Sequence, residues 1–357
     1  MSAKQSMVPK IMPLLGKVAL EEAFQPPWEM ETSTGSNISL YVYKEREAEY
    51  TSGILNIADR VKEARATGVG YTICSLTVPG VQGEVDPAKA EAFATRSNNW
   101  IAEQIKAFPE ELGAFGAVSM HNPKQAVVEM TRCIKELGFH GIMVNNWQHA
   151  VKPNGERTLL LYDGPEYDVF WSALEELDVP LYIHPSAPEA QVLDLLYHNR
   201  TFLIGPPSSF AIDVSHHVLC LVVNGVFDRH PKAQVILGHM GERLPFDLDR
   251  THRWLELVEK RRGMEAKKTI YDYFSNNIWI TTSGQFSTAV LDFCISLIGA
   301  DRILYSVDYP YEVYQDASDW FDNVNINTRD KLKIGRENAQ KLLKLGQYKD
   351  CNAPYHQ

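Results

Sequence analysis

Short apolar runs alternate with longer amphipathic stretches along most of this chain. Most of the apolar runs are bounded by Gly or Pro, and they lack the period-two pattern of a strand with one exposed face. Such runs are typical of parallel strands that are covered on both sides. They predict eight strands, at residues 17–20, 71–76, 112–118, 141–144, 181–183, 234–237, 278–281 and 303–307.

The stretch at residues 123–137 illustrates the helices expected between these strands. Its apolar residues recur at spacings of three and four, which places them on one helical face. Asn122 suits the N-cap and Pro123 suits the first helical position. Gly138 follows at a plausible C′ position, so both ends of the helix are predicted.

Eight strands with intervening helices predict an α/β fold, a parallel (β/α)8 TIM barrel. A doubly wound open sheet is the alternative, and the lack of a Gly-rich phosphate loop after the first strand favours the barrel. We expect one barrel domain at 16–350, an N-terminal extension at 1–15 and a C-terminal tail at 351–357. The chain exceeds a minimal barrel by roughly 100 residues, which we place mainly in long loops at 25–56, 148–162 and 189–205.

Composition narrows the class of protein. A hydrophobic fraction of 45% supports a large core, and a net charge of −10 argues against binding to nucleic acid. No apolar stretch reaches transmembrane length, so no membrane partner is expected. The five cysteines show no CxxC spacing and the N-terminal residues lack a long apolar segment. We therefore expect free thiols in a reducing compartment and a cytoplasmic location.

Candidate chemistry gathers where the predicted strands end, which is where barrels carry functional residues. A single His after a strand is more often a packed core residue, and Asp before Tyr-Pro is often a turn former. The coincidence of two imidazoles with several carboxylates on one rim instead favours a metal site with a proton relay. The residues are Glu21, Glu22, Asn145, His184, His239, Glu242 and Asp308.

Several motifs resemble one family in combination. They include GKVALEEAF at 16–24, YIHP at 182–185, ILGHMGE at 236–242 and ILYSVDYP at 303–310. Together with segments 119–124, 224–231 and 333–339 they resemble the aromatic decarboxylase branch of the amidohydrolase superfamily. The fungal 2,3-dihydroxybenzoate decarboxylases are the nearest members, with salicylate and γ-resorcylate decarboxylases close by. The resemblance runs from about Gly16 to Asp350.

The resemblance implies a site for one divalent metal ion and no organic cofactor. By position, the ligands would be Glu21, His184 and Asp308. Glu21 and Ala23 occupy the positions where many members of the superfamily have His-x-His, which leaves a single nitrogen ligand. An oxygen-rich shell suits a hard ion, so zinc and magnesium rank nearly equal, with manganese as a further candidate. Glu22 is interpreted as a structural neighbour.

The implied reaction is the non-oxidative decarboxylation of an aromatic acid with an ortho hydroxyl. We expect 2,3-dihydroxybenzoate as substrate, giving catechol and CO₂, with carboxylation at high bicarbonate. Asp308 is the hypothetical proton donor to the ring carbon, with His239 and Glu242 as the relay that reloads it. A water on the metal is the alternative donor.

The resemblance also suggests substrate contacts. Arg250 would anchor a carboxylate or ring oxygen, although a surface ion pair with Asp247 or Asp249 is the alternative. Asn145 would hydrogen-bond the substrate. Walls of the ring site would be formed by Phe210 and Tyr311, which could equally be ordinary barrel packing.

The chain departs from its fungal relatives close to the expected pocket. It has Asn146 for Asp, Ser186 for Arg, Asp249 for Trp and Tyr311 for Phe. These differences leave the metal chemistry intact and the ring substituents open. Salicylate or another hydroxybenzoate is therefore an alternative substrate.

Two other classes of function compete, a metal-dependent lactone or amide hydrolase of the same superfamily and a non-catalytic binder of a small aromatic molecule. The missing histidine at Ala23 argues against the hydrolase, and the retained catalytic residues argue against the binder. As partners we expect an aromatic acid and further copies of the chain, in a homodimer or homotetramer.

Overall fold

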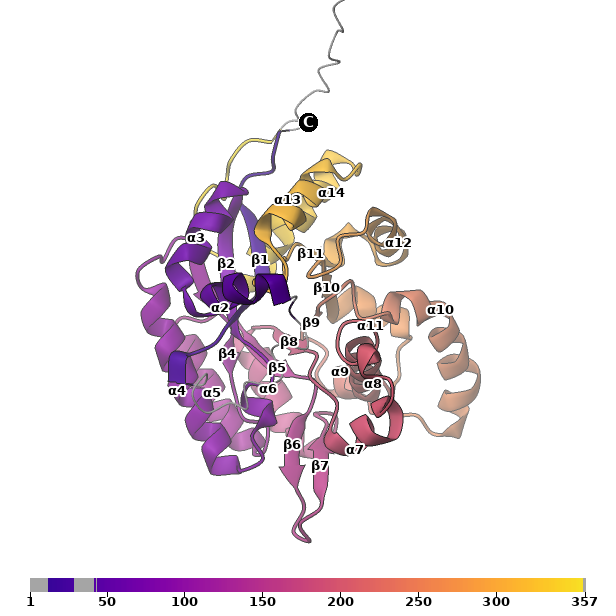
Figure 1. The fold of residues 1–357 in the computed structure, drawn as a ribbon. Helices are drawn as coiled ribbons and strands as arrows, with labels where there is room; N and C mark the ends of the chain where they lie inside the picture. Colours follow the sequence, from indigo (N-terminus) through magenta and orange to yellow (C-terminus); the bar gives the residue numbers. More distant parts are fainter. Residues whose placement is uncertain (1–11, 29–41, 43, 356–357) are drawn as a thin grey trace, which may run out of the picture.

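The protein is described by a computed structural model that covers residues 12–28, 42 and 44–355 (Figure 1). The predicted strand positions are all occupied, and one of them is split in two. The strands are β1 (Lys17–Phe24), β2 (Val69–Leu76), β3 (Leu112–Ala114), β4 (Gly116–Ala117), β5 (Ile142–Asn145), β8 (Leu181–His184), β9 (Val235–Leu237), β10 (Ile278–Thr281) and β11 (Ile303–Leu304).

These strands pair in parallel in the orders β1-β2-β3 and β4-β5-β8-β9-β10-β11. The sheets meet at Phe115, whose N–H donates to Cys74 at 2.9 Å while the next N–H, of Gly116, donates to Gly141 at 2.9 Å. At the other join, Ser306 Oγ accepts from the N–H groups of Leu20 and Glu21 at 3.1 and 2.9 Å. The order of neighbours is that of the predicted (β/α)8 fold, with side chains and single bonds bridging the two interruptions.

The strands are covered on both faces, which explains why their sequences lack alternation. One apolar cluster fills the space inside the strands and a larger one lies between strands and helices. The inner cluster ends at the C-terminal segment, where Leu343, Tyr348 and Cys351 are buried. Tyr348 donates to Gly16 O, before β1, at 3.0 Å. The amino ends of the strands are therefore plugged, which leaves the carboxyl ends for a site.

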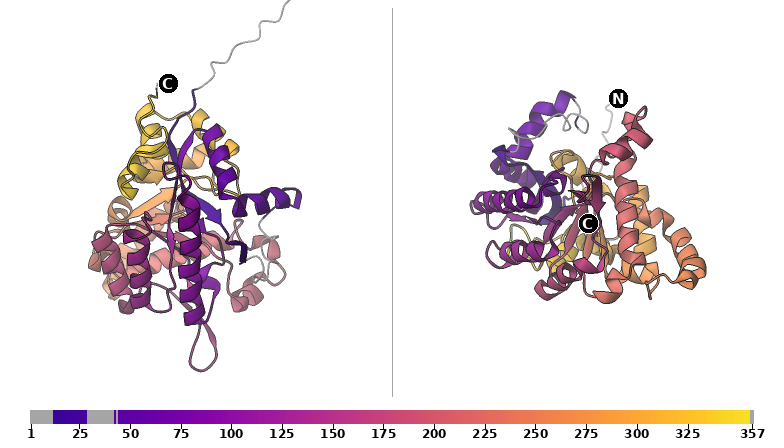
Figure 2. Two further views of the ribbon diagram at one scale, coloured as in Figure 1. Left: turned by 90° about the vertical axis from the view of Figure 1, so that its left-hand side faces the viewer. Right: turned by 90° about the horizontal axis from the view of Figure 1, so that it is seen from below.

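The helices lie outside the strands, as the further views in Figure 2 show. Helix α5 confirms its prediction, since Asn122 caps it and Gly138 adopts a φ of +73°. The helices are α2 (Glu47–Leu55), α3 (Ile57–Ala66), α4 (Pro87–Ile105), α5 (Pro123–Lys135), α6 (Asp168–Leu177), α7 (Ala190–Val192), α8 (Ser209–Val223), α9 (Val226–Arg229), α10 (Leu244–Trp254), α11 (Ile270–Asn276), α12 (Thr288–Ile298), α13 (Tyr314–Asn323), α14 (Thr328–Leu332) and α15 (Asn338–Leu343).

The expected long loops carry structure of their own. Residues 148–162 form an antiparallel hairpin of β6 (Gln148–Val151) and β7 (Arg157–Leu160), which projects at the bottom of Figure 1. Segment 25–56 ends in α2, while its residues 29–41 and 43 lie outside the described residues. The same holds for residues 1–11 of the expected N-terminal extension.

Two structural observations bear on the expected free thiols and on the expected lack of a membrane partner. All five cysteines are free thiols, and all but Cys220 are buried. Within the described ranges, every helix is too short or too polar to cross a bilayer.

Candidate metal and proton-transfer site

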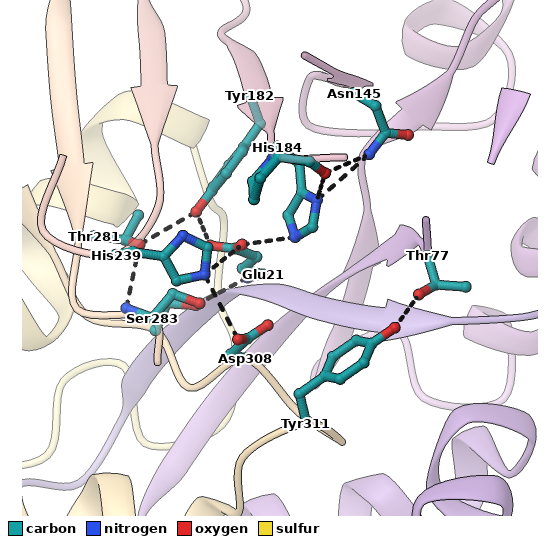
Figure 3. A network of polar contacts seen from close by, with 12 residues as sticks. Glu21, Thr77, Asn145, Tyr182, His184, His239, Thr281, Ser283, Asp308 and Tyr311 are labelled. Carbon is teal, nitrogen blue, oxygen red and sulfur yellow. Dashed lines mark hydrogen bonds and ion pairs between the residues drawn. The ribbon is translucent and has the colours of Figure 1, made fainter. Parts of the chain in front are cut away.

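Glu21, His184 and Asp308 converge at the carboxyl ends of the strands (Figure 3). Each offers one ligand atom, and these atoms all lie within 4.8 Å of one another. Glu21 comes from β1, His184 ends β8, and Asp308 follows β11. The structure thus brings together three side chains that are far apart in the sequence, in the spacing that a bound cation requires.

Glu21 faces the interior because β1 contains a bulge. Ala19 pairs with Thr72 and Glu22 with Cys74, so three steps on β1 match two on β2. A bulge of this kind reverses which side chains point inward. Leu20 belongs to the inner cluster, so strict alternation would have turned Glu22, rather than Glu21, into the interior.

The two oxygens of the Glu21 carboxylate have different surroundings, since Oε2 is closely packed and hydrogen-bonded while Oε1 has no hydrogen-bond donor in the part of the chain that the structure describes. Its Oε2 accepts from the Tyr182 hydroxyl, which also lies 3.2 Å from Thr281 Oγ1. A Cβ at Gly238 would come within 2.7 Å of the same oxygen, so glycine is needed there. Oε1 is buried without a hydrogen-bond donor among the described residues. An orphaned acidic oxygen aimed at His184 and Asp308 fits a cation at their meeting point.

The neighbours of His184 select which of its nitrogens faces the site. Nδ1–H donates to Pro185 O at 2.7 Å, and Asn145 Nδ2 donates to the same carbonyl at 3.1 Å. Nε2 is left pointing at Glu21 Oε1, 3.0 Å away. A backbone carbonyl on Nδ1 is the usual arrangement that fixes the tautomer of a metal-binding histidine.

His239 connects this cluster to a second carboxylate. Its Nδ1 lies 2.5 Å from Glu242 Oε1, and its Nε2 lies 3.6 Å from both Glu21 Oε1 and Asp308 Oδ2. The turn that carries it is strained, since His239, Met240 and Glu242 all have φ between +52° and +55°. Glu242, His239 and Asp308 thus lie in the spatial order that the predicted proton relay requires.

The surroundings shift the pKa values of the titrating groups in different directions. Burial alone would raise the pKa of Glu21, but the positive charge of His239 and the close contact with His184 lower it to about 2. Burial raises the pKa of Asp308 above its ordinary value, against the opposing hydrogen bond to His239. For His239, burial would lower the pKa, but Glu242 and Glu21 hold it well above the ordinary value. Glu21 is therefore the permanently ionised member, while Asp308 and His239 are the groups that can hold a proton.

A cavity of about 190 Å³ opens onto the cluster. His184, His239 and Asp308 lie along one part of its wall, and Phe210 and Tyr311 form another part, as predicted. The Tyr311 hydroxyl lies 2.9 Å from Thr77 Oγ1 and accepts from Tyr50 at 3.1 Å. The ring site is thus aromatic on one side, with a phenol oxygen held in a fixed position.

The other two expected substrate contacts are placed differently. Asn145 is buried beside Pro185, and the cavity lining does not include it. Arg250 is exposed on α10 and borders a separate depression with Trp254. Neither side chain touches this cavity within one copy of the chain, because Asn145 packs behind His184 and α10 carries Arg250 away from it.

Tyr182 and Ser306 are parts of the site that the sequence reasoning did not single out. Tyr182 lies two residues before His184 on β8, so the two share a face of the strand, and this spacing was a usable signal. Ser306 contacts β1 from a segment without regular structure, and its role could not be predicted from spacing.

Comparisons with known proteins agree with this geometry. The Amidohydrolase family model matches residues 52–345. The γ-resorcylate decarboxylase of Rhizobium sp. (strain MTP-10005) is 40% identical over 334 residues, covering 92% of this chain and 98% of that protein. The 2,3-dihydroxybenzoate decarboxylase of Aspergillus niger is 26% identical over 308 residues, covering 60% of this chain and 100% of that protein.

Solved structures that resemble this chain belong to decarboxylases as well. A 2,6-dihydroxybenzoate decarboxylase in complex with 2,6-dihydroxybenzoate superposes with a TM-score of 0.86 at 40% identity, over 93% of this chain and 100% of that one. A dihydroxybenzoic acid decarboxylase from Polaromonas sp. JS666, with bound manganese and 2-nitroresorcinol, gives a TM-score of 0.86 at 38% identity, over 93% and 98%. As its motifs predicted, the chain belongs to the amidohydrolase family.

Proposed function

We propose that this protein is a metal-dependent, non-oxidative decarboxylase of aromatic acids that carry an ortho hydroxyl. The observation that carries the proposal is the convergence of Glu21, His184 and Asp308 on one cavity, with the His239–Glu242 pair behind them. This arrangement supplies a cation site and a proton donor at the same wall. The decarboxylase names of the similar proteins support the same reaction.

Glu21, His184 and Asp308 would hold the cation. A divalent ion there would supply positive charge that offsets the negative charge of the acid and helps to orient its ring. Manganese is the ion to test first, since a similar structure contains it, with zinc and magnesium as competitors. No organic cofactor is needed for a reaction in which no electrons leave the substrate.

The chain's own contribution is a proton delivered to the ring carbon that bears the carboxylate. Asp308 gives the proton to that carbon, the bond to the carboxylate then breaks, and its electron pair restores the aromatic ring as CO₂ departs. Asp308, ionised as a ligand, would collect this proton from the ortho hydroxyl of the acid as the substrate binds, and burial raises the pKa of Asp308 in the direction that favours this transfer. His239, paired with Glu242, is placed to return a proton to Asp308.

Among ortho-hydroxy acids, we place 2,6-dihydroxybenzoate ahead of the expected 2,3-dihydroxybenzoate. Identity is 40% to a γ-resorcylate decarboxylase and 26% to a 2,3-dihydroxybenzoate decarboxylase. The preference for the 2,3 isomer rested on motifs that both relatives share, so those motifs do not separate the isomers. Salicylate remains in the test because it carries only the required ortho hydroxyl.

Arg250 enters the proposal through a second copy of the chain. Its exposed position excludes a contact with the cavity of its own chain as that cavity stands, while the motif resemblance implies a place near substrate. A homodimer or homotetramer that brings α10 to the mouth of a neighbouring cavity satisfies both. A cytoplasmic location also stays a prediction.

The experiment is a panel of hydroxybenzoates with the manganese-loaded protein, measured by CO₂ release and by the phenol formed. We expect turnover of acids with an ortho hydroxyl and none of 3-hydroxybenzoate or 4-hydroxybenzoate, which are matched in charge and size. Asp308→Asn should lower turnover by at least about 100-fold. Lactone hydrolysis without CO₂ release would favour the hydrolase, and tight binding without turnover would favour the non-catalytic binder.

A further inference from the structure

Glu22 is a fully buried carboxylate that points away from the candidate metal site. Its Oε1 accepts from Val307 N–H at 3.2 Å and from Ser306 Oγ at 3.3 Å, and its Oε2 accepts from Tyr309 N–H at 3.1 Å. The two backbone donors stand immediately before and after Asp308. One carboxylate thus binds the N–H groups of both residues that flank Asp308.

These bonds take the place of the backbone hydrogen bonds that would join β11 to β1 if the two strands were paired here. Strand β11 ends at Leu304, while β1 continues to Phe24. Between them, Ser306 Oγ binds two N–H groups of β1, and Ala23 N–H donates to Tyr309 O at 2.7 Å. The segment that carries Asp308 is therefore attached to β1 mainly by side chains, those of Glu22 and Ser306.

Asp308 needs such support because of its backbone conformation. Its φ is +82°, in the left-handed region that non-glycine residues rarely adopt. A conformation of this kind persists only where the surroundings determine it. A Cβ at Gly284 would lie 3.0 Å from Asp308 Oδ2, so the side chain is closely surrounded as well.

Arg60 completes the arrangement from helix α3. Its Nη1 donates to Glu22 O at 3.0 Å and its Nη2 donates to Ala23 O and, at 3.3 Å, to Gly53 O. Its guanidinium carbon lies 5.2 Å from the centre of the Tyr309 ring. Arg60 therefore fixes the backbone of β1 from the outer side. Its positive charge offsets the negative charge of the buried Glu22 carboxylate.

We propose that Glu22, supported by Arg60, is a positioning residue that holds Asp308 in the orientation needed for cation binding and proton delivery. The proposal deepens the proposed function and rests on it. Glu22 itself contacts neither the cavity nor the meeting point of Glu21, His184 and Asp308. Its effect on function must therefore pass through the 306–309 segment.

The test begins with Glu22→Gln, which preserves shape but places an amide NH₂ against one of the two backbone donors. We expect Mn²⁺ affinity, measured by electron paramagnetic resonance of the free ion, to fall by about 10-fold to 100-fold. On the best substrate of the panel, kcat should fall by a similar factor while KM changes less than about twofold. Glu22→Asp, which keeps the charge but cannot reach both donors, should behave alike and serves if the glutamine variant does not fold.

The decisive comparison is Mn²⁺ binding in an Asp308→Ala background. If Glu22 acts through Asp308, Glu22→Gln will weaken binding in the otherwise wild-type protein but add almost nothing in Asp308→Ala. An equal loss in both backgrounds would overturn the proposal. Because this readout needs no substrate, it stands apart from the panel that tests the proposed function.

Asp322→Asn is the matched control for stability. Asp322 pairs with Lys17 at 3.0 Å, both being well buried, at the other end of β1. Its loss should lower the thermal midpoint while leaving kcat and Mn²⁺ affinity within about twofold of wild type. If Glu22→Gln likewise lowers only the thermal midpoint, Glu22 is a structural residue and the proposal is wrong.

Discussion

Glu21 and Asp308 carry the same functional group within reach of one another, yet their surroundings shift them in opposite directions. The histidines lower the pKa of Glu21 to about 2, while burial raises the pKa of Asp308. Such a separation assigns different tasks to two carboxyl groups. Both are candidate ligands, but only Asp308 has a pKa shifted in the direction that favours holding and releasing a proton.

The role of Glu242 can be tested at this scale. Glu242→Gln removes the carboxylate that most raises the pKa of His239, so His239 should be protonated less often and reload Asp308 more slowly. We expect kcat to fall by about 100-fold. Mn²⁺ stoichiometry by elemental analysis should not change, since Glu242 is not one of the three candidate ligands. Glu256→Gln, which removes a surface partner of Lys260, is the control, and an equal loss in both variants would refute the relay.

Tyr311 offers a test of specificity. Its hydroxyl is held by Thr77 and Tyr50 in the cavity wall, where fungal relatives often have phenylalanine. Tyr311→Phe removes one oxygen and retains the ring. We expect kcat/KM for dihydroxybenzoates to fall about fivefold relative to salicylate, the effect of one lost hydrogen bond. An unchanged ratio would mean that the hydroxyl only supports the wall.

The elements show why some parts of the site were predictable and others were not. Residues at the ends of parallel strands must share a rim, so the convergence of His184, His239 and Asp308 follows from the fold. The choice of Glu21 over Glu22 does not, because period-two alternation from Leu20 would turn Glu22 inward. The bulge that reverses them depends on pairing with β2, so the choice of Glu21 came only from the motif resemblance.

Helix α8 contains a histidine that should make stability depend on pH. His217 is buried, with Nδ1–H donating to Asn146 O and Nε2 accepting from Tyr162 N–H at 3.0 Å. The bond from Tyr162 requires the neutral ring, because a protonated Nε2 cannot accept, and burial lowers the pKa of His217 from 6.5 to about 4. Between these values the unfolded chain binds a proton that the folded chain refuses, so this contribution to stability is lost as pH falls.

His217→Gln isolates this contribution because glutamine keeps a donor and an acceptor but does not titrate. We expect the difference in unfolding free energy between wild type and variant to shrink by about 2 kcal/mol from pH 7 to pH 5. Urea denaturation at the two pH values measures it. A difference that stays constant would show that His217 is protonated in the folded protein.

At the scale of the whole molecule, the fold and the convergence of the three candidate ligands could be predicted from sequence, and the lining of the cavity only in part. Strand patterns and rim position are properties of a single chain. Arg250 was expected near substrate on its motif alone. Its distance from the cavity depends on the direction of α10, which the motif does not give. Contacts with another copy of the chain are not encoded in a strand pattern either. Phe210 and Tyr311 line the cavity, which agrees with the wall position that the motif resemblance suggested, while their contact with substrate stays a prediction.

The expected oligomer is a prediction that exposed apolar side chains on and near α10 allow to be tested. Phe246 and Trp254 on α10 are 80% and 55% exposed, and Phe202, before α8, is 92% exposed. Large apolar side chains that gather on one side of a protein usually mark an interface. Light scattering should therefore report a dimer or tetramer, and Phe246→Glu should lower the mass without abolishing Mn²⁺ binding, because the candidate ligands come from one chain.

Mixing two inactive variants decides whether Arg250 acts on a second copy. In an Asp308→Asn homodimer every site lacks its proton donor, and in an Arg250→Ala homodimer every site lacks the arginine. If Arg250 serves the neighbouring cavity, a mixed dimer has one cavity with Asp308 from one chain and Arg250 from the other. Random exchange should then restore about one quarter of wild-type activity, since half of the dimers are mixed and each has one complete site. If Arg250 acts within its own chain, no mixed dimer contains a complete site, and activity stays at the average of the two parents.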